Sequence, residues 1–427
     1  MFHGFVTMTD PAAAPAAPPS SRRFSVDTAL PLVAVFLAAA LGLCAGLVPR
    51  GLPVWINLVT LTALVALVRR HLPLPGLPSA TGWTGAALAA GFLGLAAASL
   101  SWTPAGRAPG TLGELAYIAA AALIVGTAVR ALLPATAERL GLAVAAGVAV
   151  GVVLFGVETN ADFPLYRLFH GGNADPQAQA FNVPKRAAAA LAVLVWPAAL
   201  VLYHRWGAWA AAALLVLMGL VCLGQTSRSA LAGLAAGTLV LLALRRWPAV
   251  VVRRGLMVLT VAAFAGAVPA ALLAERVIHL SDAGWLFHSA RHRVEIWDRA
   301  ATKIVESPLL GYGLDSPRAM PAGGVTSKFE PMDNTLLPLH PHNAYLQVWF
   351  ELGAAGAVLA TALLLLVLRA VGRLSAGDQP LALALFAAGI TLSSTAYGLW
   401  QAWWMTALMA SALLTALAVC CPWRRQP

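Results

Sequence analysis

Residues 340–368 read HPHNAYLQVWFELGAAGAVLATALLLLVL, a short polar segment with two histidines that continues directly into a long apolar run. The run from residue 343 to residue 368 is long enough to cross the hydrocarbon core of a membrane as a helix, which takes about 20 residues. A polar segment of about 68 residues, from Glu275 to His342, precedes it. The chain is therefore expected to alternate between membrane-spanning helices and segments outside the bilayer.

The composition of the whole chain agrees with this reading. The chain has 427 residues, of which 60% are hydrophobic and 11% charged, and its mean hydropathy is +0.78. Apolar runs of 17 to 25 residues recur, and they contain Ala, Leu, Val and Gly in blocks rather than in alternation. This pattern argues against a transmembrane β-barrel. We expect an all-α polytopic integral membrane protein.

Windows of about 19 residues predict about twelve membrane-spanning helices. Every segment that would then lie on the cytoplasmic side is basic, which predicts that both termini are cytoplasmic. A small loop at 158–186 and a large loop at 275–342, between spans nine and ten, are predicted on the outer face. The predicted spans are residues 28–48, 53–68, 83–102, 112–133, 139–157, 187–203, 207–224, 229–244, 255–274, 343–368, 380–397 and 401–420.

The remaining segments divide the chain around these spans. Residues 1–26 lack an apolar region with a cleavage site, which predicts a disordered cytoplasmic tail rather than a signal peptide. Residues 27–274 would contain the first nine spans, residues 343–421 the last three, and residues 422–427 a second cytoplasmic tail. The net charge of +11 is scattered between apolar runs, which indicates topology and no nucleic-acid partner. No metal or disulfide spacing follows from the four cysteines, Cys44, Cys222, Cys420 and Cys421.

The large loop is predicted to be partly helical. Arg293 and Trp297 are one helical turn apart, and Ile296 and Ile304 continue an apolar stripe along the same segment. Ser307-Pro308 is expected to end this helix, and Gly311-Tyr312-Gly313 to form a turn.

Five cations near the predicted outer face could bind an anionic ligand. Arg228 opens the eighth span, where an arginine often extends its side chain to lipid headgroups. Positively charged residues are usually enriched on the cytoplasmic side, so an arginine on the outer side runs against this bias, whereas an anionic ligand there would favour it. Lys185 and Arg186 stand at the start of the sixth span, where two cations oppose the helix dipole unless a negative group binds. Arg291 and Arg293 lie on the loop helix, where pairing with Glu295 or Asp298 is the alternative. Such a set suits a phosphate.

His340 and His342 flank a proline where the large loop returns to the membrane. Either could simply cap the following helix, as could Asn343. An imidazole titrates near neutral pH, so a histidine here could also accept a proton from a sugar hydroxyl that attacks a phosphorylated anomeric carbon. A His-x-His pair has no carboxylate or cysteine partner at ligand spacing, so we expect no metal and no cofactor. No DxD, P-loop or Gly-rich motif indicates a nucleotide-activated donor.

Four short motifs follow one another along about residues 180–360. They are Thr226-Ser227-Arg228-Ser229, Arg293-x-x-x-Trp297, Pro308-Leu309-Leu310-Gly311-Tyr312-Gly313, and His342-Asn343 followed after nine residues by Gly353 and then Gly356. In this order the motifs resemble those of the bacterial O-antigen ligases. The superfamily of these ligases also contains O-antigen polymerases and protein O-oligosaccharyltransferases.

The resemblance implies an activity and a site. The activity is transfer of a polysaccharide from undecaprenyl pyrophosphate to a sugar hydroxyl of the lipid A core, at the periplasmic face of the bacterial inner membrane, with inversion and without a metal. His342 matches the essential histidine of the ligases, and His340 could assist it. Arg228 matches one essential arginine, and either Arg291 or Arg293 the other, with the spacing to the tryptophan motif favouring Arg293.

Other functions remain open. A polymerase or a protein transferase would use the same donor with a different acceptor, and the spacing to Gly353 favours the ligase. A transporter of lipid-linked glycans belongs to a different class, because it needs charged groups deep within its spans. The apolar runs contain almost none.

Overall fold

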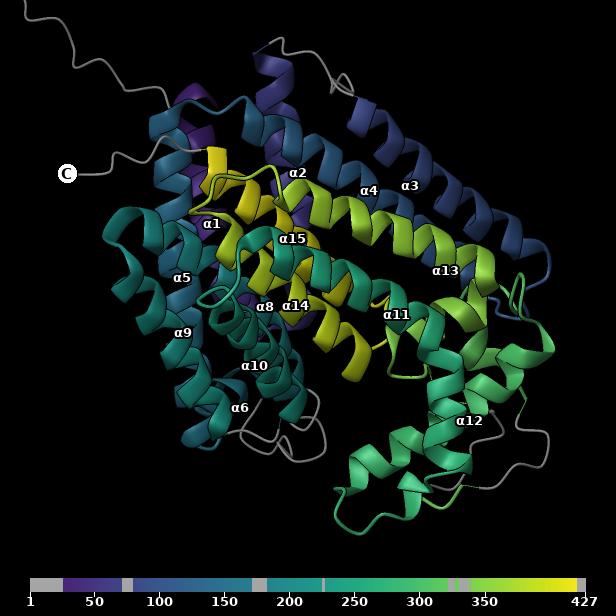
Figure 1. The fold of residues 1–427 in the computed structure, drawn as a ribbon. Coiled ribbons are helices and arrows are strands. Elements are labelled where there is room, and N and C mark those ends of the chain that lie inside the picture. Colours follow the sequence, from purple (N-terminus) through teal and green to yellow (C-terminus); the bar gives the residue numbers. More distant parts are fainter. Residues whose placement is uncertain are drawn as a thin grey trace, which may run out of the picture.

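The computed structural model is a bundle of long helices with a smaller helical unit at one end (Figure 1). It describes residues 26–70, 80–170, 183–224, 227–321, 327–329, 337 and 339–420, so nearly all of the two predicted tails lies outside the described residues. No β-strand occurs in the described part of the chain. The helices that form the bundle are α1 (Val26–Leu47), α2 (Leu52–Arg69), α3 (Ala80–Ala98), α4 (Ala108–Arg130), α5 (Pro134–Asn160), α8 (Val183–Trp206), α9 (Ala208–Leu223), α10 (Arg228–Ala243), α11 (Ala249–Arg276), α13 (Ala344–Val371), α14 (Gln379–Thr395) and α15 (Ala402–Cys420).

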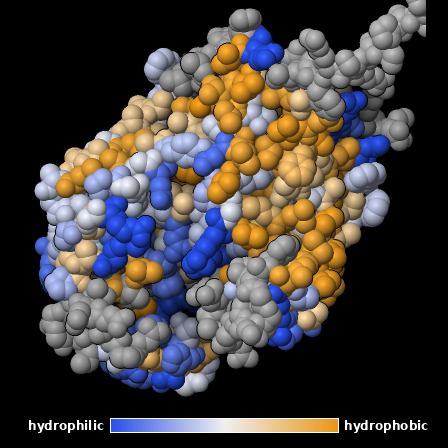
Figure 2. Space-filling view, turned by 180° about the vertical axis from the view of Figure 1, so that it is seen from behind, coloured by the Kyte–Doolittle hydropathy of each residue, from blue (hydrophilic) through white to orange (hydrophobic). Residues whose placement is uncertain are grey.

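These helices match the predicted spans one by one. Within the described ranges, nine helices are long and apolar enough to cross a membrane, and the shorter α9, α10 and α14 coincide with the seventh, eighth and eleventh predicted spans. Large apolar side chains such as Phe36 (71% exposed) and Leu220 (61% exposed) lie on the outer surface. Figure 2 shows how broad this hydrophobic surface is. The prediction of an all-α multi-pass membrane protein is therefore confirmed, and the exact number of spans stays a prediction.

Helix α8 lies at the centre of the bundle. All fifteen side chains from Ala187 to Val201 are buried, and α1, α5, α9, α14 and α15 pack around them. Small alanine side chains make this helix thin, so that several neighbours can approach it at once. The first turn of α8, which carries Lys185 and Arg186, consequently emerges from the middle of the bundle.

Helices α1 and α5 show the closest approach of two backbones in the bundle's first half. Gly42 and Gly46 of α1 face Gly147 and Gly151 of α5, and a Cβ atom at any of these four positions would overlap the backbone of the other helix. Both pairs have the Gly-x-x-x-Gly spacing that lets membrane helices pack closely. This contact joins α1 to α5, and both of these helices pack against α8.

The helical unit of the large loop is built around α12 (His288–Glu306), which lies beyond the ends of α11 and α13 (Figure 1). The predicted apolar stripe is confirmed, because Ile296 and Ile304 are buried against Leu346 and Phe350 of α13. Ser307 ends the helix, as predicted. Short helical turns flank this unit: η3 (Leu280–Asp282) before it and η4 (Ser316–Ala319) after it.

Helix α13 is interrupted at Gly353, where the backbone has φ 61° and ψ −157°. The interruption frees backbone groups that pair with the segment 308–313. Tyr312 N donates to Phe350 O and Gly313 N to Glu351 O, both at 2.8 Å, and two further amides beyond Gly353 donate back to the carbonyls of Pro308 and Leu309. The predicted turn at Gly311 and Gly313 is confirmed, with φ 65° and 89°. The large loop is thereby fastened to the middle of a membrane-spanning helix.

Candidate active site

Four segments that are far apart in the sequence meet at the α12 end of the bundle. They are the first turn of α8, helix α12, the segment 340–343 that leads into α13, and the connection between α14 and α15, which we call the α14–α15 loop (Ala396–Gln401). The predicted spans 380–397 and 401–420 left only three residues for this connection, whereas the structure gives it six, because α14 ends at Thr395. Contacts among these segments define the site.

The imidazole of His342 is fixed in one orientation. Its Nδ1 atom lies 2.7 Å from the carbonyl oxygen of Ala396. Since a carbonyl oxygen can only accept, Nδ1 carries the proton and Nε2 keeps its lone pair. The backbone of His342 has φ 54°, a left-handed conformation that residues other than glycine rarely adopt and that recurs at active sites. This histidine is therefore held with a basic nitrogen available.

His340 lies next to His342 and is more deeply buried, with 6% of its surface exposed. The two rings are 4.2 Å apart between centroids and meet edge to face. The backbone N–H of His342 donates to Nδ1 of His340 at 3.3 Å, and the Gln401 side-chain nitrogen lies 3.1 Å from Nε2. His340 thus supports the backbone of His342 from within the protein.

Burial and neighbouring charges keep both imidazoles neutral. Burial, together with the nearby Arg293, His292 and Lys185, lowers the pKa of His342 to about 4, although the hydrogen bond to Ala396 opposes the shift. Burial, followed by the proximity of His342, Arg318 and Arg293, lowers the pKa of His340 to about 2. At neutral pH both rings are in the form that can accept a proton.

Two of the sequence motifs hold the histidine segment in place. The side chain of Asn343 caps α13 by accepting from the backbone of Tyr345 and Leu346 at 3.0 and 3.2 Å, so the cap is Asn343 and neither histidine. Trp297 Nε1 donates to the carbonyl of Pro341 at 2.9 Å. The four-residue spacing from Arg293 to Trp297 therefore directs both side chains from one face of α12 toward the histidine segment.

A group of cations lies at this site, two of which, Arg293 and Lys185, act on His342. We call it the cation group (Arg50, Lys185, Arg186 and Arg293). The charge of Arg293 acts on Lys185, and that of Arg50 acts on Arg186. In the part of the chain that the structure describes, no carboxylate forms an ion pair with Arg186 or Arg293. Burial lowers the pKa of Arg293, which is half-buried. Like charges held together in this way favour a polyanionic ligand.

Tyr397 of the α14–α15 loop also belongs to this site. Its ring packs edge to face on Trp403, with centroids 4.7 Å apart. Burial raises the pKa of its hydroxyl above the usual range, and the charges of Arg186 and Arg293 act on the same group. The hydroxyl therefore stays protonated and can donate a hydrogen bond toward the space that the cations share.

Arg291 and Arg293 have different surroundings. Arg291 Nε donates to the carbonyl of Ser281 at 2.7 Å, and its guanidinium lies over the ring of Phe329 at 5.4 Å. Arg291 thus fastens parts of the large loop to each other, whereas Arg293 faces the histidines. Neither pairs with the carboxylates that the sequence offered as partners, because Asp298 binds Arg276 at 2.8 Å and Glu295 binds Arg299.

Arg228 occupies the first position of α10, as predicted, and is exposed. Its guanidinium lies over the ring of Phe287, 4.2 Å from the ring centroid, at the residue that precedes α12. The charges that act on His342 come from Arg293, His292 and Lys185. The structure thus places Arg228 beside the start of the helix that carries Arg293, and Thr226 of the same motif lies outside the described residues.

Two polar residues of α13 were missed by the sequence interpretation, which found almost no charged groups inside the spans. Glu351 is fully buried, and Gln347, one turn earlier, is 3% exposed. Glu351 accepts from the Gln347 side chain at 2.8 Å, from Trp400 Nε1 at 2.6 Å and from Asp315 N at 2.7 Å. An ionisable residue inside an apolar run indicates a functional role, and the sequence shows Glu351 inside the predicted span 343–368.

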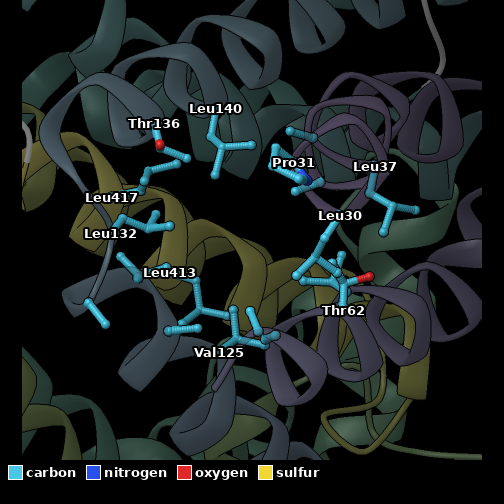
Figure 3. Close-up of a pocket in the computed structure, with 18 of the residues that line it drawn as sticks. Leu30, Pro31, Leu37, Thr62, Val125, Leu132, Thr136, Leu140, Leu413 and Leu417 are labelled. Atoms are coloured by element: carbon cyan, nitrogen blue, oxygen red, sulfur yellow. The ribbon is translucent and has the colours of Figure 1, made fainter. Parts of the chain in front are cut away.

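Two apolar cavities lie among the membrane-spanning helices. One, of about 200 Å³, is lined by α1, α2, α4, α5 and α15 and by no residue of the site (Figure 3). The other, of about 700 Å³, begins at Ala344 and Tyr345, directly after His342-Asn343, and extends between α13, α14 and α15 to Leu374 and Cys420. Only the larger cavity adjoins the site. Among the described residues, no three His, Cys, Asp or Glu side chains are placed to hold a metal ion.

Comparisons with known proteins agree with the motifs. Residues 213–361 match the family model for O-antigen ligase. A protein of Rickettsia conorii, named "Putative polysaccharide ligase", is 35% identical over 138 residues, which are 31% of this chain and 32% of that protein. A protein of the same name from Rickettsia bellii is 32% identical over 148 residues, which are 33% of this chain and 35% of that protein. The aligned part of the chain thus spans about a third of each relative.

Proposed function

Because residues 213–361 match the family model for O-antigen ligase, we propose that this chain transfers a polysaccharide from undecaprenyl pyrophosphate to a sugar hydroxyl of the lipid A core. The reaction is a glycosyl transfer with inversion and without a metal, at the periplasmic face of the bacterial inner membrane, in lipopolysaccharide biosynthesis. The names of the Rickettsia relatives support a polysaccharide as the group that is transferred.

The observation that carries this proposal is the cation group around a neutral, oriented histidine. Lys185 and Arg186 come from the centre of the bundle and Arg293 from the large loop, and their charges act on one another or on Tyr397. A pyrophosphate would bring several negative charges among them, and guanidinium groups can bind its oxygens in pairs. Both the geometry and the charge therefore fit a lipid-linked pyrophosphate donor.

His342 suits the role of general base. Its Nδ1–H is held by Ala396 O at 2.7 Å, so Nε2 faces away from that bond as the proton acceptor. In the proposed step the acceptor hydroxyl loses its proton to Nε2 while its oxygen bonds to the anomeric carbon. The bond between that carbon and the pyrophosphate breaks on the opposite face, which inverts the configuration. Arg293 and Lys185 would stabilise the charge on the leaving pyrophosphate.

The larger apolar cavity supports a polyprenyl chain on the donor. It starts beside Tyr345 and continues along α13, beyond the interruption at Gly353, to Val371 and Leu374. Apolar side chains from α11, α13, α14 and α15 line it, including Phe264, Leu364 and Leu408. A donor whose pyrophosphate sits in the cation group could lay its tail in this cavity.

Transfer in vitro tests the proposal. The protein is reconstituted in liposomes with purified lipid-linked polymer, and lipid A core, free glycan and a pilin-like peptide are offered together as acceptors. We expect polymer to appear on lipid A. Appearance of polymer on free glycan would identify a polymerase, and on peptide a protein transferase. Translocation of intact donor without transfer would indicate a transporter, and any of these outcomes would refute the ligase assignment.

The role of His342 is tested in the same assay by His342→Ala. A general base contributes on the order of 100- to 10,000-fold, so transfer should fall by at least about 100-fold. His279→Ala is a matched control, because His279 is an exposed histidine of the same loop with the same φ of 54°. Equal activity of the two variants would contradict the assignment of the base.

A further inference from the structure

Glu351 is a buried carboxylate that the proposed reaction does not use directly. It has 0% of its surface exposed, and its three partners, Gln347 Nε2, Trp400 Nε1 and the backbone N–H of Asp315, are all donors. An ionised carboxylate can accept from all three at once. An ionisable side chain inside a membrane-spanning helix is energetically costly, which indicates that its contacts have a functional role.

One side of this network controls the α14–α15 loop. Trp400 Nε1 donates to Glu351 at 2.6 Å, and the backbone N–H of Leu399 donates to Gln347 Oε1 at 2.8 Å. Gln347 in turn donates to Glu351, so both loop residues depend on the same carboxylate. Within the loop, Gln401 N donates to Gly398 O at 3.3 Å, and the side-chain bonds to Leu399 and Trp400 attach the loop to α13.

The same loop orients both histidines. Ala396 O accepts from His342 Nδ1 at 2.7 Å, the Gln401 side chain contacts His340 at 3.1 Å, and Gly398 packs against the His340 ring. A displacement of the loop would therefore release Nδ1 of His342 and allow the imidazole to rotate or change tautomer.

The other side of the network reaches the large loop. Glu351 accepts from the backbone of Asp315 at 2.7 Å, and its own carbonyl accepts from Gly313 N at 2.8 Å. Arg318 pairs with the Asp315 carboxylate at 2.8 Å. The side chain of Glu351 consequently joins three parts of the protein: α13, the turn after α12, and the α14–α15 loop.

We propose that Glu351 is a positioning residue for the reaction: together with Gln347 it fixes the α14–α15 loop so that the Ala396 carbonyl holds the Nδ1–H of His342 and leaves Nε2 free to accept the proton. This inference rests on the proposed role of His342 as the base. A residue that acts only on stability would not change the orientation of the imidazole in the folded protein.

Two variants disturb the network at different points. Glu351→Gln keeps the shape of the side chain but turns an NH₂ group toward one of three donors. Trp400→Phe removes one donor and leaves the carboxylate in place. Asp378→Asn is the matched control, since Asp378 is a buried acid that binds His204 at 2.6 Å near the opposite end of α14. Thermal unfolding of each variant identifies the folded preparations.

Transfer kinetics are the first measurement. We expect kcat to fall on the order of 10- to 100-fold in Glu351→Gln and less in Trp400→Phe, because a buried donor left without its acceptor is costly and the loop that orients His342 then shifts. KM for the lipid-linked donor should stay within about twofold, because the cation group is untouched. Asp378→Asn should keep both constants. Wild-type kcat in folded Glu351→Gln would overturn the proposal, as would a rise in KM without a fall in kcat.

A spectroscopic measurement separates this proposal from the proposed function. In protein labelled with ¹⁵N-histidine and reconstituted in bilayers, solid-state NMR reports whether His342 carries its proton on Nδ1, with His342→Ala providing the assignment. We expect the Nδ1–H signal in the wild type and in Asp378→Asn, and its shift or loss in Glu351→Gln. An unchanged signal refutes positioning even if transfer works, whereas an inactive wild type with the expected signals refutes only the function.

Discussion

The substitution Gly353→Ala tests the fastening of the large loop to α13. At φ 61° and ψ −157° the backbone of Gly353 is in a region that is essentially restricted to glycine, and another residue there costs about 1–3 kcal/mol. A Cβ atom would also lie within 2.5 Å of Leu310 N and overlap the backbone of Leu309. The segment 308–313 must therefore move away from α13.

That movement breaks hydrogen bonds whose contribution can be estimated. Four backbone bonds join the two segments, at 2.8, 2.8, 2.8 and 3.2 Å. Each contributes about 0.5–1.5 kcal/mol net, so the loss of two removes about 1–3 kcal/mol. Together with the conformational term, we expect Gly353→Ala to lower the free energy of unfolding by about 2–6 kcal/mol.

Equilibrium unfolding in detergent micelles, followed by tryptophan fluorescence, measures this loss. Gly94→Ala is the control, because a Cβ atom at Gly94 in α3 meets no other atom within 4 Å. That substitution should be neutral or stabilise by up to about 1 kcal/mol, as alanine favours a helix. If Gly353→Ala unfolds at the same denaturant concentration as Gly94→Ala, the interruption of α13 does not hold the loop and the reasoning is wrong.

Four further predictions concern the site. Arg293→Lys should lower kcat/KM for the donor on the order of 10- to 100-fold, because a charge-assisted bond contributes about 1.5–3 kcal/mol, and Arg291→Lys should have a much smaller effect in the same assay. The acid limb of the kcat/KM profile should lie near pH 4, since His342 has its pKa lowered to about 4 and becomes protonated only below it; a limb near 6.5 would contradict this. Arg228→Lys should reduce transfer, because lysine loses the planar contact with Phe287, and full activity would show that its charge alone suffices. Transfer should persist in excess chelator; a loss that added divalent ion restores would refute metal independence.

Local patterns were sufficient to predict most of the fold. Runs of apolar residues predict membrane-spanning helices because the bilayer itself requires them, so each predicted span corresponds to an observed helix. The helix at 288–306 was predicted because Ile296 and Ile304 repeat with helical spacing, and they are buried as expected. These features depend on neighbours within one or two turns, which a sequence displays directly.

The site was predictable only in part, because most of its contacts join distant segments. Lys185 and Arg293 come together as the charge pattern suggested. The spacing to Trp297 favoured Arg293 over Arg291, but no local pattern encodes the contacts of Arg291 with Ser281 and Phe329. Half of the α14–α15 loop, namely Ala396, Tyr397 and Gln401, was assigned to spans, although Ala396 determines the orientation of His342. Tyr397 likewise reaches the cations only through the packing of α14 and α15, which no local pattern encodes.

The spacing between the histidine motif and Gly353 has a physical explanation in this structure. Asn343 begins the helix by capping it, and Gly353 interrupts it, so the nine residues between them form about two and a half turns. Within this short segment Gln347 and Glu351 are one turn apart and face the α14–α15 loop together. A shorter or longer segment would rotate Glu351 away from that loop or shift the interruption away from 308–313. The spacing thus links the base, its support and the attachment of the large loop in one element.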